Sequence, residues 1–225
     1  MAWPGWPHIR FTSLRILLVT AWFCLVFAGA DWFTAHRTAR VQIDLGIESH
    51  IPLIPAFAVV YMSIYLLFLA TPFVLRTRRE VAILARAQSV TILIAGVCFL
   101  LIPATLAFAP ATNADLGFWK PLYQFADQLN LDYNLVPSLH VALSIVCIEL
   151  FSVRANAAGK ILLRAWGFLI ATSTLFTHQH HLLDAITGYL LAVAVVKVVQ
   201  RSPEKPPAEV ARSIVPPKTL SATDT

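Results

Sequence analysis

Charged residues are scarce in this chain, and their scarcity excludes an ordinary soluble domain. Asp, Glu, Lys and Arg make up 13% of the 225 residues, while hydrophobic residues make up 58%. Soluble globular domains are about one quarter charged and about half apolar. The composition therefore predicts an integral membrane protein, and the length suits one helical bundle rather than several domains.

Two other kinds of sequence signal are also missing. The three cysteines, Cys24, Cys98 and Cys147, lie inside apolar runs and have neither metal-ligand nor disulfide spacing. We expect them to be small buried side chains. The sequence contains no glycine-rich phosphate loop and no nucleotide fingerprint. These absences argue against a disulfide-stapled domain and against a nucleotide-binding enzyme.

Six apolar stretches approach the roughly 20 residues that a membrane-spanning helix needs. They are Leu14 to Ala30, Pro55 to Leu75, Val81 to Phe108, Pro137 to Val153, Ile161 to Phe176 and Leu182 to Val199. The predicted fold is an all-α, six-transmembrane-helix bundle at 14–200, between an N-terminal segment 1–13 and a proline-rich tail 201–225 that we expect to be disordered. Ala28-Gly29-Ala30 leaves open that the first stretch is a cleaved signal peptide.

The basic residues predict how the bundle is oriented. Most of them flank the start of the first stretch, the second and fourth loops, and the end of the last stretch, whereas Arg37, Arg40 and Lys120 fall on the other side. Lys and Arg gather on the cytoplasmic face. We therefore expect a multi-pass inner (plasma) membrane protein with cytoplasmic termini, whose third and fifth loops face the periplasm or exterior. The net charge of +5 is read as this topological signal and not as a nucleic-acid surface.

The third loop, from about Pro110 to Val136, contains aromatic residues and leucines at near-helical spacing. This pattern predicts a short helix resting at the membrane interface. Two roles stay open for it, a cap packed over the bundle and a rim that gathers lipid.

Two histidines lie where apolar stretches begin, at a depth where ionisable groups are costly and usually functional. His180 and Asp184 are four residues apart and so share one helix face. A carboxylate there can accept one imidazole N–H and leave the other nitrogen free as a general base, metal ligand or nucleophile. A polar anchor at the interface is the alternative reading.

His140 follows Pro137 and Ser138 at the start of another apolar stretch. Proline suits the first turn of a helix, and the free N–H groups of that turn, with the Ser138 hydroxyl, form a site for an anion. Alternatively, Ser138 only caps the helix. A protonated His140 could donate to a leaving alcohol. Together the residues predict phosphoryl transfer, with one histidine attacking phosphorus and the second protonating the departing oxygen.

His178 and His181 make the segment around His180 a dense polar cluster. Neighbouring helical residues point roughly 100° apart, so His180 and His181 do not both face His140. A metal site is therefore disfavoured, and no metal or organic cofactor is expected. We expect His181 to be an interfacial side chain.

The two histidine motifs resemble those of the type 2 phosphatidic-acid phosphatase superfamily, and most closely its branch similar to inositol phosphorylceramide synthases. The matching segments are 133–140 (Tyr-Asn-Leu-Val-Pro-Ser-Leu-His), 173–184 and 51–55 (Ile-Pro-Leu-Ile-Pro), and the likeness covers about residues 50–195. The resemblance implies His180 as nucleophile, Asp184 as its partner and His140 as general acid. It also implies Ser138 as a phosphate contact, with Asn134 in the same motif as a substrate-binding candidate.

The chain departs from the superfamily pattern in its cations. The first motif of the superfamily supplies a lysine and an arginine, but residues 103–110 here (Pro-Ala-Thr-Leu-Ala-Phe-Ala-Pro) contain neither. Residues 173–174 are Ser-Thr instead of the usual Ser-Arg, and His178 stands where a lysine is frequent. Because charge-assisted bonds hold phosphate strongly, a dianionic phosphate should bind less well. Lys120, His178 and Arg37 are the candidate replacements.

The predicted function is a metal-independent membrane phosphatase or phosphotransferase that acts on a lipid phosphate ester through a phosphohistidine. Water would be the acceptor in a phosphatase, and an alcohol such as inositol in a transferase. Its partners would be the lipid substrate and the bilayer, with the oligomeric state open. A catalytically degenerate lipid-binding or assembly protein of the same fold is one alternative, and a small proton-coupled transporter using His140 and His180 is another.

Overall fold

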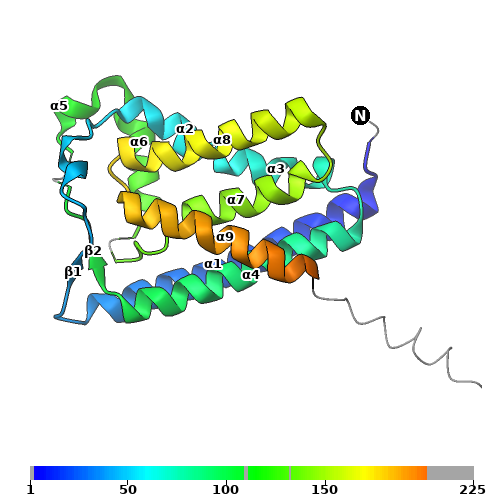
Figure 1. Ribbon diagram of the computed structural model, residues 1–225, viewed down its shortest axis with the longest axis horizontal. Coiled ribbons are helices and arrows are strands. Elements are labelled where there is room, and N and C mark those ends of the chain that lie inside the picture. Colours follow the sequence, from blue (N-terminus) through cyan, green and yellow to red (C-terminus); the bar gives the residue numbers. More distant parts are fainter. Residues whose placement is uncertain (1–2, 109–110, 132, 202–225) are drawn as a thin grey trace, which may run out of the picture.

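The computed structural model describes residues 3–108, 111–131 and 133–201, which form a mainly helical bundle (Figure 1). In chain order the elements are α1 (Trp6–Ala35), β1 (Val41–Gln42), η1 (Ile47–His50), η2 (Pro55–Phe57), α2 (Ala58–Met62), α3 (Ile64–Val74), α4 (Arg78–Leu101), β2 (Ala104–Thr105), α5 (Asn113–Leu116), η3 (Gly117–Trp119), α6 (Lys120–Leu129), α7 (Leu139–Ser152), α8 (Ala157–Phe176) and α9 (Leu182–Arg201). The predicted disordered tail falls almost wholly outside the described residues.

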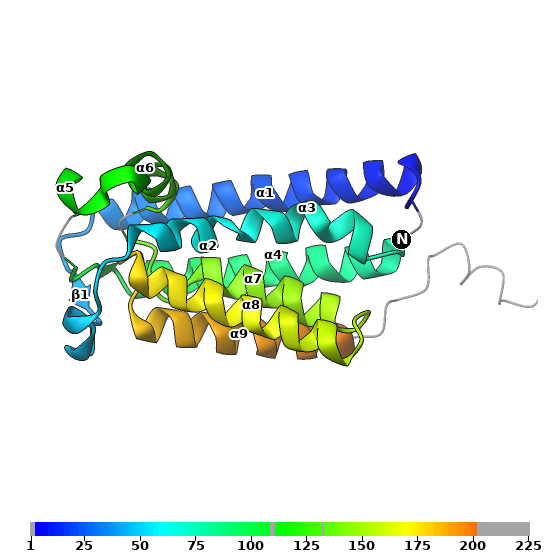
Figure 2. The same ribbon diagram turned by 90° about the horizontal axis from the view of Figure 1, so that it is seen from above.

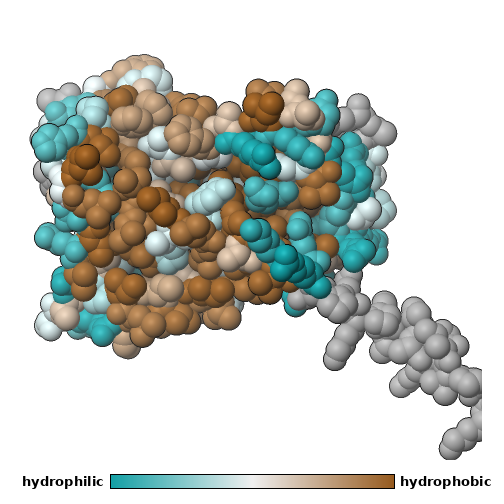
Figure 3. Space-filling model, in the orientation of Figure 1, coloured by the Kyte–Doolittle hydropathy of each residue, from teal (hydrophilic) through white to brown (hydrophobic). Residues whose placement is uncertain are grey.

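The long helices lie side by side along the longest axis of the molecule (Figures 1 and 2). One end, which we call the loop-rich end, carries β1, β2, η1, α5 and α6. The other, which we call the basic end, carries the start of α1, the turns α3–α4 and α7–α8, and the end of α9. A broad apolar band separates two more hydrophilic ends on the surface (Figure 3). This distribution is the one expected of a protein that crosses a bilayer.

Four of the described helical segments are long and apolar enough to cross a membrane. They are Trp6–Ala35, Pro55–Val74, Arg78–Leu101 and Leu182–Arg201. The all-α membrane class is therefore supported. α7 is apolar but has 14 residues, and α8 has 20 but is not among these four. Six complete crossings remain a prediction.

Two predicted helix boundaries are wrong for identifiable reasons. The third stretch was expected to continue to Phe108, but α4 ends at Leu101. Pro103 has no N–H and restricts the residue before it, so the helix stops, and Ala104–Thr105 pairs in parallel with Val41–Gln42. At the other end of the chain, α1 begins at Trp6 rather than Leu14, with a proline in its first turn.

α7 forms the centre of the bundle. All its residues are buried except His140 and Glu149, which are partly exposed. Its apolar side chains form one continuous core with residues of α3, α4, α8 and α9, including Leu84, Val146 and Ile170. A helix that is apolar on every face lies either in a protein core or in a membrane, and α7 is enclosed by neighbouring helices. α7 therefore holds whatever its first turn carries at a fixed place in the bundle.

The cysteine prediction is correct at one position only. Cys147 in α7 is buried, but Cys24 in α1 is exposed and Cys98 is partly exposed. α1 lies at the outside of the bundle, so apolar residues on its outer face meet the surroundings rather than the core. Being apolar does not mean being buried in a protein whose surroundings are lipid.

Glu80 connects two turns at the basic end through hydrogen bonds. Its Oε2 accepts hydrogen bonds from the main-chain N–H groups of Arg76 and Thr77 at 3.0 and 2.9 Å, which caps α4. Its Oε1 lies 2.6 Å from Arg154 Nε in the α7–α8 turn. The hydrogen bond to Glu80 raises the pKa of the Arg154 guanidinium. One carboxylate thus joins two turns at this end of the bundle.

Gly188 lets α9 cross the start of α7 in direct contact. A Cβ at this position would lie 2.5 Å from the Ser138 carbonyl oxygen, which is main chain and cannot rotate away. We expect Gly188→Ala to lower the free energy of unfolding by about 1–3 kcal/mol, because the helices must separate. For a chain of this size, that corresponds to a thermal midpoint about 2–12 °C lower.

The matched control for this prediction is Gly29→Ala in α1, where a Cβ meets nothing within 4 Å. It should be neutral or raise the midpoint slightly, because alanine favours helix over glycine. Thermal unfolding in detergent measures both variants. Equal midpoints for the two would contradict the close α7–α9 packing.

Candidate active site

The starts of α7 and α9 meet at the loop-rich end. The main-chain N–H of Ser138 donates to the carbonyl of Asp184 at 3.0 Å, and Gly188 lies against the same serine. Two motifs about forty residues apart are therefore joined through their backbones. This junction puts His140 and His180 at the same end of the bundle, as the sequence predicted.

A tight turn after α8 sets the place of His180. The N–H of Gln179 donates to Thr174 O at 3.0 Å and the N–H of His178 to Leu175 O at 3.0 Å, which is the pattern of a Schellman motif. His178 has φ 55°, a left-handed conformation that usually needs glycine. The turn ends the helix and reverses the chain, so that His180 comes before α9.

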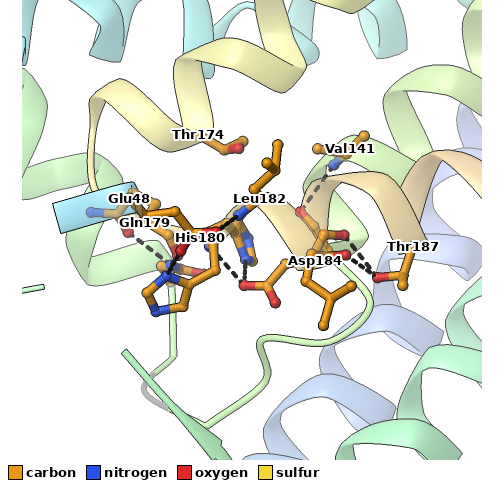
Figure 4. Close-up of polar contacts among 12 residues, drawn as sticks. Glu48, Val141, Thr174, Gln179, His180, Leu182, Asp184 and Thr187 are labelled. Carbon is orange, nitrogen blue, oxygen red and sulfur yellow. Dashed lines mark hydrogen bonds and ion pairs between the residues drawn. The ribbon is translucent and has the colours of Figure 1, made fainter. Parts of the chain in front are cut away.

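His180 and Asp184 lie together in a buried place, as Figure 4 shows. His180 Nδ1 is 3.4 Å from Asp184 Oδ2, and the two residues are 2% and 0% exposed. Asp184 Oδ2 also accepts the main-chain N–H of His181 at 2.9 Å. Within the described residues, neither His180 Nδ1 nor Asp184 Oδ1 has a hydrogen-bond partner. Such separations commonly shorten when substrate binds, so the pair is placed for an imidazole–carboxylate bond.

The backbone and ring of Tyr61 orient His140. His140 Nε2 lies 2.8 Å from the Tyr61 carbonyl oxygen, and the two rings stack with centroids 3.7 Å apart. A carbonyl only accepts, so Nε2 must carry a proton. The atom left for exchange with another molecule is therefore His140 Nδ1.

Both histidines open into one cavity of about 570 Å³ between α1, α3, α4 and α7. His140, His180, Asn130 and Asn134 form one polar part of its lining. Most of the remaining lining is aliphatic or aromatic, with Thr20, Thr71 and Gln88 as polar exceptions. This volume falls in the range of about 300–1,000 Å³ typical of ligand sites. No lysine or arginine occurs among the described residues that line it.

Asn134, predicted from its motif, is buried and lines this cavity. Its Nδ2 donates to the carbonyl of Phe27 at 2.6 Å, which fixes the direction of the amide. Its Oδ1 has no partner among the described residues. A buried acceptor without a donor is unfavourable, so this oxygen is available to a bound molecule.

Ser138 is fully buried and caps α7, since its hydroxyl oxygen accepts the N–H of Val141 at 3.3 Å. The capping alternative is therefore observed, and a phosphate contact from Ser138 stays a prediction. The candidate replacement cations lie outside the cavity lining. His178 Nε2 donates to Ile51 O at 3.0 Å, Arg37 donates to Leu100 O, and Lys120 begins α6.

The chain matches the family model described as the PAP2 superfamily over residues 32–198. The chain belongs to the PAP2 superfamily. Membership indicates a phosphatase-type enzyme or a phosphotransferase that acts on phosphate esters. Neither a search of curated proteins nor a search of solved structures found a match.

In this PAP2 superfamily protein, His181 corrects a sequence prediction. It was expected at the interface, but it is 0% exposed. Its Nδ1 bonds to Glu48 Oε2 and its Nε2 accepts the N–H of Ala107. Glu48 is not part of any motif in the sequence, yet it reaches the site from η1 (Figure 4). A glutamate in an irregular loop has no periodic pattern that would reveal its partner.

The helix predicted in the third loop is present as α6, and it covers the turn before His180. Its position at a membrane interface stays a prediction. Tyr123 Oη donates to the carbonyl of Thr177 at 2.9 Å, and burial raises the pKa of this phenol. Gln179 Nε2 donates to Asp127 Oδ1 at 2.9 Å, while Asn130 Nδ2 donates to Gln179 Oε1 at 2.7 Å. These contacts support the role of a cap. Phe118 and Phe125 remain exposed on the same segment, which leaves the lipid-facing role open as well.

Metal ligation has no geometric support in the part of the chain that the structure describes. Within it, no group of three or more His, Cys, Asp and Glu side chains is arranged to hold a metal ion. The histidines and carboxylates instead pair with each other and with the main chain.

Proposed function

We propose that this protein is a membrane phosphotransferase or phosphatase that acts on a lipid phosphate ester through a phosphohistidine on His180. The observation that carries the proposal is the single cavity that both His140 and His180 line. The end beside the two histidines offers a nucleophile and a proton donor, and most of the remaining wall is apolar. A molecule with a phosphate at one end and a hydrocarbon chain at the other fits both parts.

The side-chain geometry supports a sequence of two displacements. His180, with its Nδ1 proton directed at Asp184, attacks phosphorus through Nε2, and the bond from phosphorus to the leaving oxygen breaks. His140, protonated on both nitrogens, gives its Nδ1 proton to that oxygen and keeps its Nε2 proton on Tyr61 O. Water or an alcohol then attacks phosphorus, His140 Nδ1 takes the proton, and the phosphorus–Nε2 bond breaks.

The cavity shape favours a lipid. Cavity-lining residues of α1 extend from Ile16 to Phe27, which is about 16 Å along a helix. That is close to half of a hydrocarbon layer of about 30 Å, the length available to a chain from one leaflet. Tyr65 and Leu69 of α3 line the cavity but are 45% and 68% exposed. The cavity therefore opens sideways between α1 and α3, toward the bilayer.

The residues that line the cavity also favour one kind of phosphate ester. A phosphodiester carries one negative charge and needs fewer cations than a monoester, which suits a site whose described lining holds histidines but no lysine or arginine. The unpartnered Asn134 Oδ1 can accept a hydrogen bond from a hydroxyl group of a lipid headgroup or of an acceptor alcohol. These two features favour transfer to an alcohol, as in the branch similar to inositol phosphorylceramide synthases.

The distribution of charge supports a six-crossing arrangement in which the loop-rich end faces the periplasm or exterior. Arg76 and Arg154 lie in the turns of the basic end and Arg79 lies in the first turn of α4, at the end where the first helix starts and the last one ends. Positive charge favours the cytoplasm. The substrate phosphate would then be processed at the outer leaflet.

A second candidate is a lipid-binding member of the superfamily that performs no chemistry. It is favoured by the same lack of lysine and arginine around the cavity. Binding of lipid phosphate without turnover would support it over the enzyme.

The test of the proposed function is a phosphate-release and headgroup-exchange screen on purified protein without added metal. The probes are phosphatidate, polyprenyl pyrophosphate and phosphatidylinositol, each with and without an alcohol acceptor. We expect turnover of at least one lipid. We also expect that adding a metal chelator does not inhibit this turnover. Absence of turnover of any probe by folded protein would contradict the proposal.

The sideways opening makes its own prediction. Cys24→Trp places a large ring in the cavity lining of α1, so we expect KM for a long-chain lipid to rise about 10-fold or more. KM for a short-chain analogue should change less, because it does not need the apolar part. Leu25→Trp is the matched control, since Leu25 is 68% exposed and is not among the lining residues. Equal KM values for the two variants would show that the hydrocarbon chain of the lipid does not occupy this opening.

A further inference from the structure

Glu48 and His181 form a second buried histidine–carboxylate pair beside His180 and Asp184. His181 Nδ1 donates to Glu48 Oε2 at 2.5 Å, and the main-chain N–H of Leu182 donates to Glu48 Oε1 at 2.9 Å. Glu48 is 1% exposed and His181 is 0% exposed. A buried carboxylate requires donors for its oxygens. Here two consecutive residues of one turn supply them.

The other nitrogen of His181 settles where its proton lies. Nε2 accepts the main-chain N–H of Ala107 at 3.1 Å, so Nε2 carries no proton. The ring proton is therefore on Nδ1, directed at Glu48. His181 is a neutral imidazole bonded at both nitrogens, and this arrangement differs from that of a surface histidine that exchanges protons with water.

The backbone on each side of His181 is held by the same network. The N–H of His181 donates to Asp184 Oδ2 at 2.9 Å, the same oxygen that lies 3.4 Å from His180 Nδ1. The ring of Phe108 stacks on His181 with centroids 4.8 Å apart. The segment from His180 to Leu182 is thus tied to two distant parts of the chain, through Glu48 and Ala107, and to the first turn of α9 through Asp184.

We infer that Glu48 is a positioning residue, which acts through His181 to set the orientation of His180 and Asp184. The inference rests on the proposed function, because it assigns Glu48 a part in that reaction. Glu48 does not line the cavity and so is not placed to touch the substrate. Its two bonds instead prevent rotation of the turn that carries the nucleophile. A displacement of about 1 Å at such a turn is enough to slow a reaction about 100-fold.

The competing explanation is that Glu48 only stabilises the fold. The substitution Glu48→Gln distinguishes this role from the positioning role. The glutamine amide must turn its NH₂ toward either His181 Nδ1–H or Leu182 N–H, so one donor faces another donor. If Glu48 only stabilises the fold, the variant should be less stable and its active site should be unchanged. A positioning residue predicts that the His180 ring changes its environment even in protein that remains folded.

Glu80→Gln is the matched control, because Glu80 also caps a helix with its carboxylate but lies at the basic end. The two variants and wild type are labelled with nitrogen-15 histidine, and His180 is assigned by its loss in His180→Asn. In wild type we expect a proton on Nδ1 and none on Nε2 of His181, as its hydrogen bonds to Glu48 and Ala107 require. In Glu48→Gln we expect the His180 signals to shift, and in Glu80→Gln to match wild type.

Turnover supplies the second readout. Glu48→Gln should lower kcat about 10-fold or more with KM changed less than about 2-fold, because the nucleophile and not lipid binding is affected. Glu80→Gln should retain the wild-type kcat even where its thermal midpoint falls. Unchanged His180 signals in folded Glu48→Gln, or an equal loss of kcat in both variants, would overturn the inference.

The wild-type spectrum keeps the inference testable if Glu48→Gln does not fold. A His181 ring that carries its proton on Nε2 instead of Nδ1 would overturn it without any variant. If wild type turns over no lipid, the proposed function fails and the positioning role in catalysis fails with it. The nitrogen signals then show separately whether Glu48 orients His180.

Discussion

Replacement of His180 by alanine is expected to abolish turnover of a lipid phosphate, lowering kcat by at least about 10⁴-fold. The reason is that alanine offers no lone pair to phosphorus, so the covalent route is lost rather than slowed. Lipid binding should persist, because most of the cavity wall is apolar and comes from α1, α3, α4 and α7. The measurement is phosphate release or headgroup exchange at saturating lipid, beside a binding assay.

The matched control is His50→Ala, since His50 is exposed at the same end of the molecule and does not line the cavity. It should retain wild-type kcat. Turnover by His180→Ala within about 10-fold of wild type would remove His180 from the nucleophile role. Loss of lipid binding together with turnover would point to damage of the fold instead.

Asp184→Asn has the second largest expected effect, a loss of about 10²–10⁴-fold in kcat with little change in KM. Asp184 Oδ2 accepts the N–H of His181, and His180 Nδ1 lies beside the same carboxylate. Asparagine keeps an acceptor oxygen in the place of Oδ2, where it can still face both His181 N–H and His180 Nδ1, but it carries no negative charge. The imidazole becomes positively charged when its Nε2 bonds to phosphorus, and the variant lacks the carboxylate that stabilises this charge.

The matched control here is Asp115→Asn, an exposed carboxylate that accepts the N–H of Thr112 at 2.9 Å in the cap of α5. The hydrogen bonds from Thr112 lower the pKa of the Asp115 carboxyl. This variant should lose a little stability and no activity. If Asp184→Asn keeps more than about a third of the wild-type kcat, the negative charge of Asp184 does not assist the reaction of His180.

Much of the bundle could be predicted from the sequence because hydropathy reports directly on helices in a membrane. The approximate positions of the long helices followed from their apolar runs. The end of α4 was missed although Pro103 signalled it, since a continuous apolar run outweighed one helix-breaking residue. The exposure of Cys24 was missed because hydropathy does not distinguish a lipid-facing residue from one in the core.

The site could be predicted in part. The convergence of His140 and His180 on one cavity follows from two motifs that each begin a helix at the same end of the bundle. Glu48 could not be found this way, because it lies 133 positions before its partner His181, in a loop with no repeating pattern. The spacing of His181 beside His180 was visible, but helix geometry suggested that it points outward. The turn that ends α8 removes that geometry, and the ring is buried.

Trapping the covalent intermediate tests the central claim most directly. Wild-type protein is mixed with a lipid labelled at its phosphate, quenched within the first turnover, and digested for mass spectrometry under alkaline conditions that preserve phosphohistidine. The account predicts an acid-labile phosphoryl group on His180 in the wild-type protein and none in His180→Ala. In His140→Ala the phosphoryl group should accumulate when the substrate has a leaving group that needs no protonation. Turnover that proceeds with no phosphoryl group on His180 at any quench time, or with the label on another residue, would contradict it.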